Sequence, residues 1–135
     1  MLVRVAVGII LRNDAVFLAL RKSNQHQGGL WEFPGGKCEP TELVQTALAR
    51  ELLEECGITV IESAFFKKIA HDYGDKQVEL HFYKVTAFDG EPVGSEGQEV
   101  TWSAISDLSS YHFPEANLPI VSELMSTAVY ISQKS

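Results

Sequence analysis

The sequence predicts an α/β fold in which a mixed β-sheet lies between α-helices. Stretches rich in Val, Ile and Phe are separated by turn residues, which predicts several strands. Two other stretches space their apolar residues as helices do. The 135 residues fit one domain, residues 1–135, with a core of its own.

The first strand is expected at 3–12, where Val3, Val5, Val7 and Ile9 fall on one face. Asn13 and Asp14 form a turn signal, and a second strand at 16–21 completes a hairpin. The polar, glycine-containing segment 23–29 then predicts a loop.

A helix is expected within residues 36–58. Its end is well marked, because Gly57 follows the last periodic residue and suits a left-handed position. Its start is predicted at Thr41 as N-cap, which puts Glu42 in the first turn, where the helix dipole favours a carboxylate.

The rest of the chain predicts further strands joined by turns and loops, then a terminal helix. Strands are expected at 63–72, 78–88 and 99–102. A turn at 73–76 joins the first two, and a loop at 89–97 precedes the third. A short helical turn is expected at 103–108 and the terminal helix at 119–131.

Composition limits the partners. A net charge of −7 argues against general binding of nucleic-acid polymers, whose affinity depends on phosphate contacts. A nucleotide substrate remains compatible, because bound metal ions can invert the local field. The chain has no apolar run that could span a bilayer, and its start lacks a signal peptide's charged front and cleavage site. Cys38 and Cys56 are expected to be reduced thiols, which favours a cytoplasmic protein.

Three carboxylates on the helix indicate a metal site. Glu51, Glu54 and Glu55 fall within an arc of roughly 100° and repel one another. Such clusters are often only solvated surface, but a cation would stabilise this one, and oxygen ligands favour Mg²⁺ or Mn²⁺ over zinc. Arg50 is expected to pair with Glu54 or to brace the neighbouring loop. Glu96, in a glycine-containing loop, is either solvated or a further ligand.

These residues stand in one fixed pattern: G, five residues, E, seven residues, R-E-aliphatic-x-E-E-x-G-aliphatic, running from Gly36 to Ile58. The pattern resembles the Nudix box at every specified position. The resemblance implies a Nudix hydrolase with the Nudix α/β/α sandwich, which uses Mg²⁺ held by the box glutamates, with Mn²⁺ as a substitute.

The segments AVGII, WEFPGGK, GEPVGSEGQEVTW and FPEANLPI extend the resemblance over nearly the whole chain. They are similar to MutT-type 8-oxo-dGTP diphosphatases. This implies attack at the β-phosphorus of 8-oxo-dGTP and related oxidised purine nucleotides. The products would be the monophosphate and pyrophosphate, and removing the oxidised precursor protects DNA replication from mutation.

In that family the asparagine of FPEAN reads the base, which is Asn117 here. One amide offers both an acceptor and a donor, which matches the N7–H and O6 of 8-oxoguanine, whereas guanine presents two acceptors there. The alternative for Asn117 is a helix cap near Pro119.

The predicted site has three parts. Glu51 is the preferred base, with Glu96 second and Arg50 in support. Cationic side chains beside a metal site suit a polyphosphate chain. The family often carries two arginines where this chain has Arg21 and Lys22, and lysine lacks the bidentate geometry of arginine. Phe33 is assigned to the substrate although it also suits the core. The metal set is Gly35, Glu51, Glu54, Glu55 and Glu96, and the substrate set is Arg21, Lys22, His26, Phe33, Gly36, Lys37 and Asn117.

Two alternatives remain. A pyrophosphohydrolase of the same fold acting on CTP or modified pyrimidine nucleotides shares WEFPGGK and the box, and FPEAN disfavours it. A non-catalytic nucleotide-binding Nudix module would be expected to have lost box glutamates, which this chain retains. We expect a monomer that binds a small nucleotide and neither a nucleic-acid polymer nor a membrane.

Overall fold

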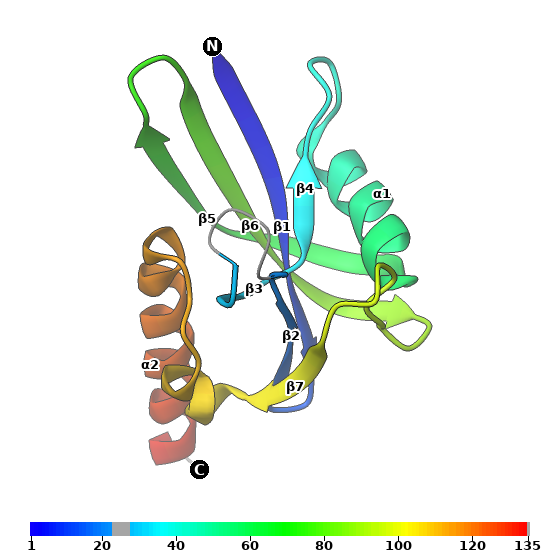
Figure 1. Cartoon of the computed structure of the whole chain (residues 1–135). Helices are drawn as coiled ribbons and strands as arrows, with labels where there is room; N and C mark the ends of the chain where they lie inside the picture. Colours follow the sequence, from blue (N-terminus) through cyan, green and yellow to red (C-terminus); the bar gives the residue numbers. More distant parts are fainter. Residues whose placement is uncertain (23–27, 135) are drawn as a thin grey trace.

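The computed structural model describes residues 1–22 and 28–134, which form a mixed sheet with a helix on each face (Figure 1). The strands of this part are β1 (Leu2–Arg12), β2 (Ala15–Leu20), β3 (Trp31–Glu32), β4 (Gly35–Lys37), β5 (Thr59–Asp72), β6 (Gln77–Asp89) and β7 (Val100–Ala104). Its helices are α1 (Val44–Cys56) and α2 (Leu118–Lys134), with short 3₁₀ turns η1 (Ile105–Ser110) and η2 (Glu115–Asn117).

Strand β1 is the centre of the sheet. The strand order is β3-β2-β1-β6-β5, with β1 and β6 parallel, β4 pairing with β1 and β7 with β2. On one edge, β1 pairs with β4 at Val5–Val7 and with β2 only from Leu11 onward. The sheet therefore divides beside the middle of β1, and the segment from β3 to β4 crosses there.

Each face of the sheet has its own core. Helix α1 packs Leu48 and Leu52 against Ala6 and Ile10 of β1, and helix α2 packs against Val7 and Ile9 on the opposite face. Both sides of β1 are therefore buried, as expected for a central strand with helices on both faces. This confirms the predicted α/β fold with its sheet between helices.

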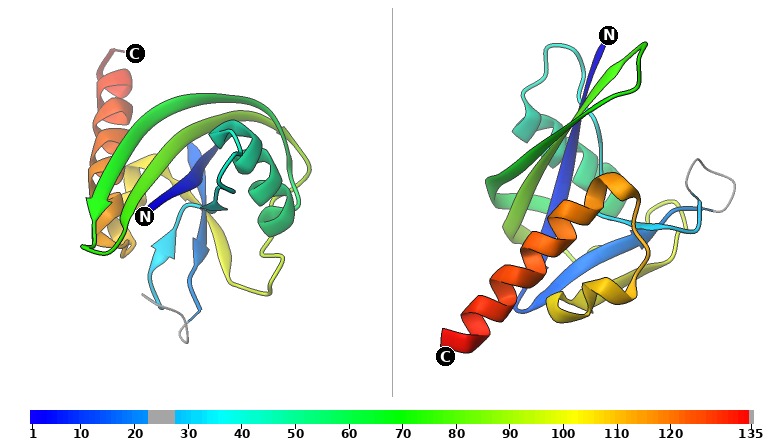
Figure 2. Two further views of the ribbon diagram at one scale, coloured as in Figure 1. Left: turned by 90° about the horizontal axis from the view of Figure 1, so that it is seen from above. Right: turned by 90° about the vertical axis from the view of Figure 1, so that its left-hand side faces the viewer.

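The hairpin of β5 and β6 is long and curved. Its register shifts three times, between Val60 and Ser63 and again between Phe65 and Lys67. Such bulges bend a strand, and Figure 2 shows both strands arching over one side of the molecule. The turn at its tip was predicted: the Tyr73 N–H donates to the Lys76 carbonyl at 2.9 Å. The curvature brings this tip beside the candidate site.

The predicted strands and helices are present, with ends that differ by a few residues. Strands β3 and β4 were not predicted, because two or three residues carry no periodicity. Cys38 and Cys56 are free thiols, as expected. Burial raises the pKa of Cys56 to about 12 and also raises the pKa of Cys38. No helix within the described ranges is long and apolar enough to cross a membrane.

Candidate active site

The site begins where β4 passes between β1 and α1. A Cβ atom added to Gly35 would overlap the backbone carbonyl of Ala6, and one added to Gly36 would overlap the Glu51 carboxylate. Only glycine permits both approaches. The Glu51 side chain is 14% exposed and rests against the Cα atom of Gly36.

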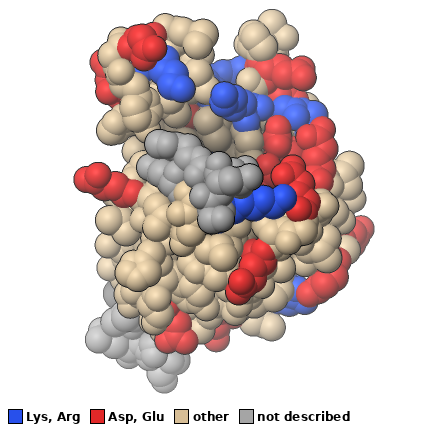
Figure 3. Space-filling model, viewed as in Figure 1, with Lys and Arg blue, Asp and Glu red and all other residues tan. Residues whose placement is uncertain are grey.

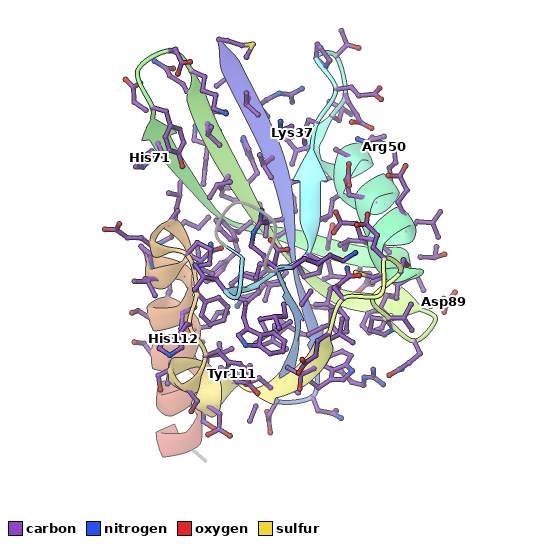
Figure 4. All side chains as sticks on the ribbon, in the orientation of Figure 1. Lys37, Arg50, His71, Asp89, Tyr111 and His112 are labelled. Atoms are coloured by element: carbon purple, nitrogen blue, oxygen red, sulfur yellow. The ribbon has the colours of Figure 1, made fainter. Side chains whose placement is uncertain are left out.

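Arg50 fixes the position of Glu51. Its Nη1 donates to Oε1 of Glu51 at 2.9 Å, while Nε and Nη2 donate to the two oxygens of Glu42 at 2.9 and 2.8 Å. Nη2 also donates to the Lys37 carbonyl at 3.2 Å, so Arg50 braces the loop, as predicted. In Figure 4, Arg50 is labelled on α1 and Lys37 on the neighbouring strand β4. The predicted pair with Glu54 is longer, at 3.7 Å.

These contacts also explain why the helix start was predicted wrongly. Helix α1 begins at Val44, with Leu43 in the N-cap position and no side-chain cap hydrogen bond. Glu42 therefore lies before the helix and not in its first turn, and Thr41 is not the N-cap. The Glu42 carboxylate instead accepts from Arg50 and from the Glu39 N–H, and these bonds lower its pKa to about 2.

Glu55 is the most perturbed carboxylate of the helix. Its pKa is raised to about 7, chiefly by burial and next by the negative charges of Glu51 and Glu32, with Glu96 also contributing. The Gly35 N–H donates to it and partly offsets these effects. Carboxylates from three separate segments therefore interact at this point. Glu54 differs, since its side chain is 59% exposed.

Glu96 reaches this cluster because its loop docks on the end of α1. The Val93 and Ser95 N–H groups donate to the carbonyls of Cys56 and Glu55 at 3.0 and 3.1 Å. A small pocket of about 130 Å³ results between the loop, β2 and β4. It is lined by Leu20, Arg21, Lys22, Glu32, Gly35, Glu55, Glu96 and Gln98.

The donor set of this cluster fits a hard divalent cation. Within residues 1–22 and 28–134, no group of three or more His, Cys, Asp or Glu side chains is placed so that it could hold a metal ion as the structure stands. However, Glu51, Glu55 and Glu96 supply carboxylate oxygens, the ligand type that Mg²⁺ and Mn²⁺ prefer. Burial raises the pKa of Glu55 most, and the nearby negative charges raise it further; a bound cation would offset both effects.

A larger pocket of about 600 Å³ adjoins the small one and shares Arg21, Glu32 and Gly35 with it. Asn117, the last residue of the 3₁₀ turn η2, lies in its wall, and Gly36 and Lys37 line the side nearest α1. Figure 4 shows His71 near the end of β5, on the other side of β1 from Lys37. The pocket that Asn117 lines therefore adjoins the pocket that Glu55 and Glu96 line.

The predicted cationic residues have different positions. Arg21 Nη1 donates to Oε1 of Glu32 at 2.7 Å, and both residues line both pockets. Lys22 lines the small pocket and Lys37 the large one. His26 lies outside the described residues. Figure 3 shows acidic and basic side chains intermixed over the part of this face where α1 and β4 lie.

Phe33 belongs to the core and also lines the large pocket. It is 4% exposed and stacks on Phe113 with ring centroids 5.4 Å apart, so it belongs to the core, as its apolar character suggested. It also lines the large pocket. Phe113 precedes Pro114 and the η2 turn, so this stacking contact supports the segment that carries Asn117.

Several lining residues were not predicted from the sequence, among them Glu32, His71 and Tyr73. Glu32 is the second residue of the WEFPGG segment and lines both pockets. Its neighbours Phe33, Gly35 and Gly36 were predicted as site residues, so its place in the sequence was a signal that it also belongs to the site. His71 and Tyr73 line the large pocket from the β5–β6 hairpin, with ring centroids 4.3 Å apart. No local signal marks this pair, since only the curvature of the hairpin brings it to the site.

Comparison with known proteins identifies the family of this chain. A model of the NUDIX domain family matches residues 6–123. The chain is 38% identical to the 8-oxo-dGTP diphosphatase of Escherichia coli over 90% of this chain and 95% of that protein. It is 32% identical to the CTP pyrophosphohydrolase of the same organism, covering 92% of each. The structure reported for MutT from Aliivibrio salmonicida and Vibrio cholerae superposes with a TM-score of 0.86 at 41% identity, covering 94% of this chain and 99% of that one.

Proposed function

Because this chain belongs to the NUDIX family of hydrolases, we propose that it is an 8-oxo-dGTP diphosphatase, which converts 8-oxo-dGTP to the monophosphate and pyrophosphate. Enzymes of this family generally act with a divalent metal ion. The observation that carries the proposal is that two pockets, one lined by Asn117 and the other by Glu55 and Glu96, adjoin and share Arg21, Glu32 and Gly35.

We assign base recognition to the large pocket. Its volume of about 600 Å³ is within the usual range for small-molecule sites. The Asn117 amide would accept the N7–H of 8-oxoguanine and donate to O6. Unmodified guanine has an acceptor at N7, so the same amide orientation would leave one of these contacts unpaired, which is costly in a buried site. His71 and Tyr73 form the wall of this pocket on the hairpin side.

We assign phosphate hydrolysis to the carboxylate cluster. Glu51, Glu54, Glu55, Glu96 and Gly35 would hold Mg²⁺, with Mn²⁺ as a substitute, and the ion would supply charge neutralisation for the triphosphate. Glu51 would accept the proton of the attacking water, and its hydrogen bond from Arg50 keeps it oriented for that task. Glu96 is the second candidate for the base.

The cationic side chains would hold the phosphates. Lys22 and Lys37 line the two pockets, and His26 is assigned the same role from the sequence alone. Arg21 is held by Glu32 at the boundary between the pockets, where the sugar and phosphates of a bound nucleotide would meet. Lysine offers a point charge in place of the second arginine often found there in this family.

The remaining assignments follow from the same function. A cytoplasmic monomer that binds a free nucleotide, and neither a nucleic-acid polymer nor a membrane, fits the net charge of −7. The similarity to the CTP pyrophosphohydrolase makes CTP and modified pyrimidine nucleotides the competing substrates. A non-catalytic binding module is the third candidate, and the retained box glutamates argue against it.

Steady-state kinetics with Mg²⁺ test the proposal. Pyrophosphate release would be measured with 8-oxo-dGTP, dGTP, CTP and 5-methyl-dCTP. We expect the largest kcat/KM for 8-oxo-dGTP, and a loss of that preference by about 10-fold or more in Asn117→Ala. A pyrimidine preference would overturn the substrate, and no turnover of any of the four would favour the binding module.

Asn117→Asp is the matched variant. Aspartate caps a helix as well as asparagine does, but its carboxylate cannot donate to O6. If Asn117 reads the base, the aspartate variant loses the preference for 8-oxo-dGTP. If Asn117 only caps α2, the aspartate variant retains it.

A further inference from the structure

Arg4, outside the Nudix box, holds the loop that leads into α1. From β1, its Nη2 donates to the backbone carbonyls of Glu39, Pro40 and Glu42 at 2.9, 3.2 and 2.8 Å. Its own carbonyl accepts the Cys38 N–H at 2.8 Å. One residue of the central strand therefore binds the loop both through its backbone and through its side chain.

The loop needs such a contact. Three carbonyl oxygens converge on one nitrogen, and their partial negative charges would repel one another without a cation between them. The helix that follows has no side-chain cap, since Leu43 occupies the N-cap position. The Arg4 guanidinium thus supplies an interaction that the loop sequence itself does not.

The loop also determines where Glu51 lies. Glu42 contributes its carbonyl to Arg4 and its carboxylate to Arg50. Arg50 in turn donates to Oε1 of Glu51. The contacts therefore run without a gap from the Arg4 side chain to the carboxylate assigned as the base.

We propose that Arg4 is a positioning residue, which holds Glu42 and Arg50 in place and thereby orients Glu51 toward the divalent ion. This inference rests on the proposed function, because it concerns the same metal site. Arg4 touches neither substrate nor metal in this role. It differs from a residue that only stabilises the fold, since its loss would impair metal binding and turnover while the sheet remains intact.

Arg4→Ala tests the proposal through direct Mn²⁺ binding to the nucleotide-free protein, measured by electron paramagnetic resonance, and through kcat and KM for 8-oxo-dGTP. We expect Mn²⁺ affinity or kcat to fall about 10- to 100-fold, the usual effect of removing a contact that orients a ligand. KM for the nucleotide should change little, because the base pocket does not contain Arg4.

Arg12→Ala is the control. Arg12 lies on the same strand and forms a bidentate ion pair with Glu91, at 2.9–3.0 Å. Its removal should leave Mn²⁺ binding and kcat unchanged. Added guanidinium at concentrations far below denaturing levels should restore part of the activity of Arg4→Ala by occupying the vacated carbonyl cluster, a rescue that a purely structural defect would not show.

The outcomes separate the two proposals. Unchanged Mn²⁺ affinity and kcat in Arg4→Ala, or an equal loss in Arg12→Ala, would overturn the role of Arg4. Wild-type protein that binds Mn²⁺ but hydrolyses no nucleotide would overturn the proposed function, while the Mn²⁺ comparison would still decide the role of Arg4. Wild-type protein that binds no Mn²⁺ would overturn both.

Discussion

Replacing Glu55 by glutamine is expected to stabilise the metal-free protein above neutral pH. The folded protein raises the pKa of Glu55 from an ordinary 4.5 to about 7, so the folded state binds this proton more tightly than the unfolded state does. The stability that results is fully present below pH 4.5 and is lost as the pH rises through 7. Glutamine cannot ionise, so the variant escapes that loss and keeps an oxygen for the Gly35 N–H.

The size of the effect follows from that pKa difference. The gap between 4.5 and about 7 corresponds to at most about 3.5 kcal/mol at pH 8, at roughly 1.4 kcal/mol for each pKa unit. Solvent reaches part of the carboxylate and screens it, which reduces the expected gain to roughly 1–2 kcal/mol. For a chain of this length, that gain raises Tm by about 4–7 °C.

Urea unfolding at pH 4.5 and pH 8, with a chelator present, measures the difference. Glu55→Gln should gain stability over wild type at pH 8 and little at pH 4.5. Saturating Mg²⁺ should reverse the order at pH 8, because the ion stabilises wild type more than a variant that lacks one ligand. Glu54→Gln is the control, since it removes the same charge from a side chain that is 59% exposed. An equal gain in both variants, or a gain at pH 4.5 as large as at pH 8, would refute the reasoning.

Three further substitutions test the geometry of the site. Glu51→Gln should lower kcat by about 10²–10⁴-fold in the steady-state assay, with an unchanged melting temperature, because it removes a proton acceptor and little packing. Gly36→Ala should also lower kcat while the protein stays folded, since its Cβ would displace the Glu51 carboxylate; wild-type turnover would contradict this contact. Gly35→Ala should instead destabilise the fold by about 2 kcal/mol or more in urea unfolding, because its Cβ would meet the backbone of Ala6.

The fold was predictable where periodicity is strong. Strand β1 alternates its side chains between two buried faces, and α1 and α2 each carry an apolar stripe, so all three were found from the sequence. Strands β3 and β4 hold two and three residues, and only pairing with β2 and β1 makes them strands. Such pairing between distant segments has no signature in the local sequence.

The site was predicted unevenly for a similar reason. The spacing of Glu51, Glu54 and Glu55 and the pair of glycines can be read along the chain, and the structure places Glu55 near Glu51 and Glu96. The helix start was predicted wrongly because the Glu42 carboxylate accepts hydrogen bonds from Arg50, eight residues away, and Glu42 lies before the first turn of the helix. His71 and Tyr73 were missed because their contribution depends on the bend of a hairpin whose bulges the sequence does not mark.

The two thiols bear on the conditions under which such an enzyme would work. Oxidised nucleotides accumulate when a cell is exposed to peroxide, which attacks cysteine as the thiolate. With a pKa of about 12, only about one Cys56 side chain in 10⁵ is a thiolate at neutral pH. The raised pKa of Cys38 also favours its unreactive thiol form. Both cysteines lie within the Nudix box, so catalysis would resist the same oxidants that generate its substrate.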